Sequence, residues 1–173
     1  MILPGASIIQ MAWVVTDLEA AARKFSTAYG AGPFVFNRHI SLDNPSHRGQ
    51  PVRTDFSTCI LQAGDIQIEL IEQHDDTASV YRDLYAKGQE GFHHVAVIVP
   101  DVAAEVARYQ ALGFAVASAG QFGTTDFAYI DTVSATGHMV EVLGDNDGLR
   151  RFFGSVRRAA ENWDGLDPIK IMS

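Results

Sequence analysis

The chain has 173 residues, of which 47% are hydrophobic and 20% are charged, a composition typical of a globular protein with a sizeable core. Its formal net charge of −8 argues against nucleic acid as a partner, because phosphate binding requires a basic surface. No stretch approaches the roughly 20 apolar residues that cross a bilayer, and no secretory signal opens the sequence. The single Cys59 has no partner for an internal disulfide. We therefore expect a cytoplasmic protein that binds neither nucleic acid nor membrane.

The sequence contains an internal repeat. Residues 8–30 (IIQMAWVVTDLEAAARKFSTAYG) and residues 92–113 (FHHVAVIVPDVAAEVARYQALG) both begin with an alternating apolar strand. Each strand is followed by an Ala-rich segment whose apolar residues fall on one helical face. The predicted cap residues are Asp17 and Asp101 at the helix starts, and Gly30 and Gly113 at the helix ends.

The later strands repeat in the same order. Residues 55–62 (DFSTCILQ) resemble residues 126–131 (DFAYID), and the final strands are predicted at 66–71 (IQIELI) and 138–143 (HMVEVL). Each half is therefore expected to fold as a β-α-β-β-β module, and the fold class is α+β with a curved mixed sheet. We predict a single domain over residues 1–173, with module one at about 8–73, a connector at 74–90, module two at about 91–144 and a helical tail at 145–173.

Four polar side chains occupy equivalent positions in the two halves: Gln10 and His94 in the first strands, and Glu69 and Glu141 in the last strands. Two buried carboxylates that approach each other repel strongly unless a cation lies between them. The mixed nitrogen and oxygen set suits one divalent ion, namely Zn²⁺, Ni²⁺, Co²⁺, Mn²⁺ or Fe²⁺, with Zn²⁺ as the first choice. Taken singly, each residue also has a structural interpretation: a hydrogen-bonding glutamine, solvent-facing glutamates and a core histidine.

Candidate substrate contacts come mainly from a long polar segment at residues 37–54 (NRHISLDNPSHRGQPVRT). Loops of this length are often functional. Its basic residues can bind a carboxylate, a phosphate or a CoA group, and the alternative is a solvated surface loop. The predicted substrate-binding residues are Arg38, His39, Arg48 and Arg53, together with Phe122 and Tyr129 as apolar lining.

Two other features receive structural interpretations. His93 and His138 alternate with the candidate ligands along their strands, so we expect them to face away from the site. The tail at 149–163 (LRRFFGSVRRAAENW) combines an apolar side with four arginines. We expect it to pack across the sheet, to form a dimer contact or to cover the cleft, rather than to lie on a membrane surface.

The stretches GFHHVAVIVPDV at 91–102 and GHMVEVLG at 137–144 resemble the vicinal oxygen chelate superfamily, as does the order of elements from about residue 8 to 144. This superfamily includes lactoylglutathione lyase (glyoxalase), methylmalonyl-CoA epimerase, extradiol dioxygenases and bleomycin-resistance proteins. The resemblance implies paired β-α-β-β-β modules around a metal-floored cleft. It also implies that the metal ligands are Gln10, Glu69, His94 and Glu141, a set similar to that of eukaryotic-type lactoylglutathione lyase.

The same resemblance implies a metal-dependent lyase or isomerase, glyoxalase- or epimerase-like, that moves a proton next to a carbonyl through a metal-stabilised enediolate or enolate. Glu141 is the first candidate for the proton carrier and Glu69 is the second. The positions that grip glutathione in the lyase fall on Val14, Glu90 and Gln73, none of which supplies a cationic clamp. We expect a small-molecule carbonyl substrate and a homodimer.

Two alternatives remain open at this point. One is a binding protein for an aromatic or hydrophobic compound, as in the bleomycin-resistance members of the superfamily. The other is a ring-cleaving dioxygenase, which is disfavoured because Gln10 replaces one of the two histidines that such enzymes use to hold iron.

Overall fold

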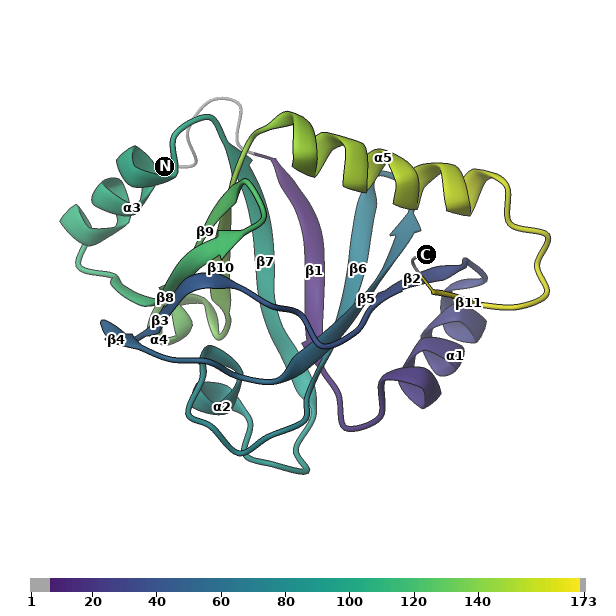
Figure 1. Ribbon diagram of the computed structural model, residues 1–173, viewed down its shortest axis with the longest axis horizontal. Coiled ribbons are helices and arrows are strands. Elements are labelled where there is room, and N and C mark those ends of the chain that lie inside the picture. Colours follow the sequence, from purple (N-terminus) through teal and green to yellow (C-terminus); the bar gives the residue numbers. More distant parts are fainter. Residues whose placement is uncertain (1–6, 172–173) are drawn as a thin grey trace.

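The computed structural model describes residues 7–171, which fold around a single curved mixed sheet of eleven strands (Figure 1). The strand order is β11-β2-β5-β6-β1-β7-β10-β9-β8-β3-β4. The first strands of the two repeats, β1 and β7, pair antiparallel at the centre, and each runs parallel to the last strand of its own half, β6 or β10. The predicted α+β fold with a curved mixed sheet is confirmed.

The elements follow the repeat along the chain. The first half consists of β1 (Ile8–Val14), α1 (Leu18–Tyr29), β2 (Phe34–Asn37), β3 (Asp43–His47), β4 (Gln50–Pro51), β5 (Phe56–Ala63) and β6 (Ile66–Gln73). A short helix, α2 (Val80–Leu84), leads into β7 (Gly91–Val99), α3 (Val102–Ala111), β8 (Ala115–Phe122), β9 (Thr125–Asp131), α4 (Val133–Thr136) and β10 (Met139–Gly144). The chain then continues through α5 (Asp147–Glu161) to β11 (Ile169–Ile171).

The residues that were predicted to cap the repeated helices lie at the helix ends in the structure. The carboxylates of Asp17 and Asp101 accept hydrogen bonds of 2.9 Å from the backbone N–H groups of Ala20 and Ala104. These bonds satisfy amide groups that a helix start leaves without partners. Gly30 ends α1 in the left-handed conformation, at φ 62°.

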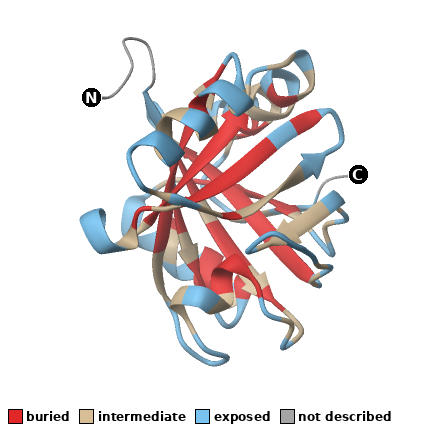
Figure 2. Cartoon of the chain, turned by 90° about the vertical axis from the view of Figure 1, so that its left-hand side faces the viewer, coloured by how far each residue is buried: buried red, intermediate tan, exposed pale blue. Residues whose placement is uncertain are grey.

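The two faces of the sheet are covered differently. Helix α1 packs through Leu18 and Ala22 onto one face, and α3 covers the same face in the second half. Helix α5 lies on the opposite face, where Val156 and Ala159 pack against β2 and β5. Figure 2 shows that burial is concentrated along the central strands. The tail therefore packs across the sheet, which is one of the arrangements expected for it.

The polar segment at 37–54 is only partly a loop. It carries β3 away from its own module to the far edge of the sheet, where Asp43 pairs with Gln121 and His47 pairs with Ser118 of β8. Sequence alternation did not indicate this strand because its side chains are exposed or half-buried, and the backbone of the edge strand supplies the pairing. We call residues 38–55 the excursion, since this segment of the first module joins the second by backbone pairing.

None of the helices within residues 7–171 combines the length and the apolar composition that crossing a bilayer requires.

The capping geometry leads to a stability prediction. Replacing Asp101 with alanine should lower the free energy of unfolding by about 1 kcal/mol, because the Ala104 amide loses its acceptor. Asp101→Asn retains a side-chain oxygen and should keep most of the stability. Urea unfolding followed by circular dichroism measures both. An equal loss in the two variants would contradict a role for the cap.

Candidate active site

Two rows of side chains cross the centre of the sheet: Glu69–Ala12–His94 and Gln10–Ala96–Glu141. The central residue of each row is an alanine, and Ala12 and Ala96 are both 0% exposed. A methyl group at these positions leaves space above the sheet into which the longer side chains on either side converge. The repeat thus places four polar side chains around the local twofold axis between β1 and β7.

Three of the four candidate ligands meet closely. The Nε2 atom of His94 lies 3.6 Å from Oε2 of Glu69 and 3.4 Å from Oε2 of Glu141. Two ligands bound tetrahedrally to one ion at about 2.1 Å lie roughly 3.4 Å apart. The side chain of His94 is fully buried, and those of Glu69 and Glu141 are only 12% and 11% exposed. The spacing and the donor set therefore fit a divalent ion.

Gln10 borders the same cavity. Its side-chain nitrogen donates a 3.3 Å hydrogen bond to Oε1 of Gln67, which leaves the amide oxygen available to a ligand. The residue is 2% exposed. The four residues therefore offer two neutral donors, an amide oxygen and an imidazole nitrogen, and two anionic carboxylates. Borderline divalent metals bind such mixed nitrogen and oxygen ligands.

His93 determines which nitrogen of His94 faces the carboxylates. The Nε2 atom of His93 lies 3.0 Å from the carbonyl oxygen of Val80, which can only accept, so this nitrogen carries the proton. Its Nδ1 atom lies 2.9 Å from Nδ1 of His94 and, being unprotonated, accepts a hydrogen bond from the Nδ1–H group of His94. His94 is left with an unprotonated Nε2 directed at Glu69 and Glu141, as metal-binding histidines require.

The position of His93 corrects the expectation that it faces away from His94. The register of β1 and β7 shifts between Ala12 and Trp13, so that His93 is the additional residue of a β-bulge. A bulge interrupts the strict alternation of side chains along a strand. Burial and, to a smaller extent, the neighbouring His94 lower the pKa of His93 to about 3, so the ring is neutral at physiological pH.

The electrostatics of the cluster also point to a cation. Burial raises the pKa of the Glu69 carboxyl well above its usual range, and the nearby Glu141 adds to the effect. Among the buried side-chain atoms of residues 7–171, Nε2 of His94 is one of two nitrogens without a hydrogen-bond partner. An unpaired nitrogen lone pair beside two acidic groups is unfavourable. A divalent ion satisfies all three groups at once.

Gln10, Glu69 and Glu141 form the floor of a cavity of about 130 Å³, and His94 lies against the two carboxylates. Its walls are predominantly apolar and come from the excursion, β5, α2, the strands of the second half and α5. The apolar lining residues are Ile40, Leu42, Val52, Phe56, Ile60, Val80, Tyr81, Phe122, Phe127, Tyr129, Leu143, Leu149, Phe152 and Phe153. Burial raises the pKa values of the Tyr81 and Tyr129 phenols, so both keep their protons. No lysine or arginine of the described chain lines this cavity.

The structure separates the six predicted substrate-binding residues into two groups. Phe122 and Tyr129 line the cavity, whereas the four basic residues lie outside it. The basic residues are engaged as follows: Arg38 with Glu19, His39 with Asp55, and Arg48 with Asp83 and Asp131, while Arg53 borders a separate surface pocket. Their contact with a substrate stays a prediction.

Two residues that border the site were not recognised from the sequence. His93 was obscured by the bulge, and Tyr81 lies in the connector, whose path over the sheet no repeat pattern indicates. The rings of Tyr81 and His93 lie 5.3 Å apart, and Tyr129 lies 5.9 Å from His93. His138 behaves as expected for a structural residue, since its ring packs edge-on against Phe92.

A family model described as the Glyoxalase/Bleomycin resistance protein/Dioxygenase superfamily matches residues 9–129. The chain therefore belongs to this superfamily, whose members include enzymes and commonly bind a divalent metal. No protein with a curated description matches the chain.

Solved structures share the fold at low sequence identity. A hypothetical protein from Bacillus halodurans C-125 is 15% identical, with a TM-score of 0.61 over 83% of this chain and 97% of that one. Methylmalonyl-CoA epimerase from Mycobacterium tuberculosis is 18% identical, with a TM-score of 0.57 over 87% and 97% of the two chains. A variant of methylmalonyl-CoA epimerase from Streptomyces coelicolor, in complex with 2-nitronate-propionyl-CoA, is 19% identical, with a TM-score of 0.53 over 80% and 96%.

The hydrogen bonds around His93 predict a specific pair of tautomers. In metal-free protein, nitrogen-15 NMR of the imidazole rings should show His94 protonated on Nδ1 and His93 protonated on Nε2. His93→Phe removes the acceptor and should mix the tautomers of His94. His138→Phe serves as the matched control and should leave the His94 signals in place. A wild-type His94 protonated on Nε2 would overturn the assignment.

Proposed function

We propose that the protein is a metal-dependent lyase or isomerase that transfers a proton next to the carbonyl of a small molecule. The observation that carries this proposal is the convergence of His94 Nε2 with the carboxylates of Glu69 and Glu141 at the floor of an apolar cavity. Membership in a superfamily that includes enzymes supports it.

The residues that would hold the metal are Gln10, Glu69, His94 and Glu141. The donor set favours Zn²⁺ first and Ni²⁺, Co²⁺, Mn²⁺ or Fe²⁺ as alternatives. When bound, such an ion stabilises the negative charge that develops on a carbonyl oxygen as the neighbouring carbon loses a proton. His93 keeps the ring of His94 in the orientation and tautomer that this binding needs.

The two carboxylates are the proposed proton carriers, with Glu141 as the first candidate and Glu69 as the second. They approach the cavity floor from different halves of the sheet, one beside Ala96 and the other beside Ala12. One carboxylate can remove a proton from a carbon atom and the other can return it on the opposite face of the substrate. This arrangement suits isomerisation or epimerisation.

The cavity walls suggest the kind of substrate. Apolar side chains surround the floor, so the reacting part should carry an apolar substituent and should be shielded from water by Phe153 and its neighbours. A charged portion such as a CoA group would have to lie outside, near Arg38, Arg48 or Arg53. A related structure is described as methylmalonyl-CoA epimerase with bound methylmalonyl-CoA, which makes acyl-CoA thioesters reasonable first compounds to test.

A second candidate function is the binding of an aromatic or hydrophobic compound without turnover, and the apolar lining favours it. Ring cleavage by a dioxygenase is a weaker candidate, because Gln10 replaces a histidine that such iron sites use. A homodimer also stays a prediction.

The first test is metal content, measured by plasma emission on protein purified without an affinity tag or added metal. About one transition metal per chain is expected, since the four ligands suit one ion. Gln10→Ala and Glu141→Ala should lose it, and Glu161→Gln, at the exposed end of α5, should keep it. A wild-type protein that neither contains nor takes up any of the five metals would overturn the catalytic proposal.

The second test is exchange of a substrate α-proton with deuterium, followed by proton NMR on acyl-CoA thioesters and small oxo-acids. Glu141→Gln should slow exchange by about 100-fold or more, because it removes the proton carrier. Tight binding of a compound to metal-free protein, without exchange, would favour the binding function instead.

A further inference from the structure

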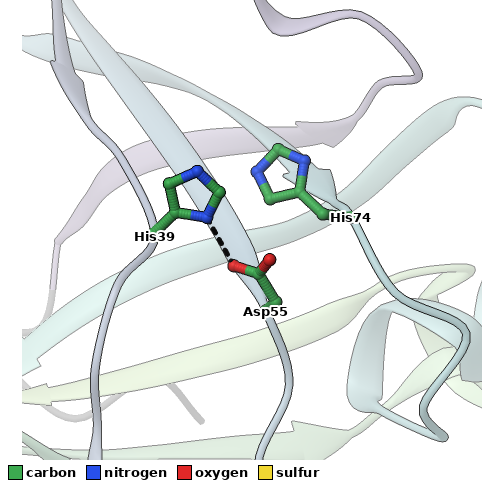
Figure 3. Close-up of side chains that lie close together, drawn as sticks. All are labelled: His39, Asp55 and His74. Atoms are coloured by element: carbon green, nitrogen blue, oxygen red, sulfur yellow. Dashed lines mark hydrogen bonds and ion pairs between the residues drawn. The ribbon is translucent and has the colours of Figure 1, made fainter.

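A second cluster of metal-binding side chains lies outside the cavity. His39, Asp55 and His74 each offer one ligand atom, and these atoms all lie within 4.8 Å of one another. Figure 3 shows the two imidazole rings and the carboxylate turned toward the same space. None of these residues lines the cavity that holds the first site.

The fold brings the three residues together from distant points of the sequence. His39 follows β2, Asp55 precedes β5 and His74 follows β6, and these three strands are neighbours in the sheet. His39 and Asp55 are therefore close to the two ends of the excursion, and His74 begins the connector. A ligand held by all three side chains would fasten the base of the excursion to the end of β6.

The existing contacts orient the ring of His74, and an ion bound at Nε2 would take the place of the Ser57 hydroxyl there. Its Nε2 atom lies 2.8 Å from Oγ of Ser57, and its Nδ1 atom lies 3.4 Å from Oε1 of Glu72. The other oxygen of Glu72 accepts a 2.9 Å hydrogen bond from the backbone N–H of Leu18, so the carboxylate is itself fixed. A carboxylate on the far nitrogen of a histidine is the usual support of a metal-binding imidazole.

The other two side chains are free to adjust. Nδ1 of His39 lies 2.7 Å from Oδ1 of Asp55, and the rings of His39 and His74 are 4.8 Å apart between centroids. Ligands of one ion at about 2.1 Å lie at most roughly 4.2 Å apart, so atoms that lie within 4.8 Å of one another need at most a small closure. The side chains of His39 and Asp55 are 67% and 48% exposed, so they can rotate without disturbing the core.

The donor chemistry selects the ion. Two imidazoles and one carboxylate suit Zn²⁺ and similar borderline metals, whereas Mg²⁺ and Ca²⁺ prefer oxygen ligands. We propose that His39, Asp55 and His74 form a second divalent-metal site, independent of the cavity site, and that a bound ion fastens the excursion. Since Ile40, Leu42 and Val52 of the excursion line the cavity, this surface site steadies a wall of the candidate active site.

The experiment is a titration of the full chain with Zn²⁺ by calorimetry. Wild-type protein should take up one Zn²⁺ per chain at micromolar concentration beyond the ion at the cavity floor. The double variant His39→Gln/His74→Gln should lose only this uptake, and Glu141→Ala should lose only the other. Asp55→Asn should weaken the same uptake. Asp76→Asn, at a nearby exposed carboxylate paired with Lys87, is its matched control and should bind as the wild type does.

The fastening role has its own readout. Saturating Zn²⁺ should slow amide hydrogen exchange in residues 40–54 of the wild type and leave it unchanged in His39→Gln/His74→Gln. Uptake that is unaffected by the double variant, or that needs millimolar Zn²⁺, would overturn the site and leave only a hydrogen bond between His39 and Asp55 at the surface. Uptake without protection of residues 40–54 would overturn the fastening role. Neither result depends on the metal at the cavity floor.

Discussion

The constraint on which the site depends is the meeting of two nearly buried carboxylates and an imidazole nitrogen at the centre of the sheet. Removing such groups from water is costly unless an opposite charge compensates them. Because Ala12 and Ala96 are small, the acidic side chains beside them can extend into one space with His94. A divalent cation in that space turns an unfavourable cluster into a binding site.

The duplication places the four candidate metal ligands symmetrically. The connector and the tail, which lie outside the repeat, make their surroundings asymmetric. The connector carries Val80, whose carbonyl fixes the proton on His93 and thereby the free nitrogen of His94. The tail brings Leu149 and Phe153 over the cavity. These additions turn a symmetric pair of strands into the floor of a predominantly apolar cavity with polar groups at its base, which is the usual composition of a small-molecule site.

The excursion is the element that joins the two halves beyond their central pairing. It leaves the first half at β2, pairs with β8 at the far edge and returns to β5. Arg48 reinforces the crossing, at 2.7 Å from Asp83 in α2 and 2.8 Å from Asp131 in β9. His39, Asp55 and His74 lie near the two ends of the excursion. The molecule thus places charged contacts where a wall of the cavity is anchored.

The sequence by itself determined the repeated modules, the helix caps and the equivalence of Gln10 with His94 and of Glu69 with Glu141. Hydrophobic period, cap chemistry and self-similarity are local properties, and a repeat converts equal positions into spatial symmetry. Only the tertiary structure decided that His93 supports His94, that the excursion pairs with β8 and that His39, Asp55 and His74 meet. A bulge, an edge pairing and a meeting of three strand ends depend on contacts between distant segments, which no local pattern encodes.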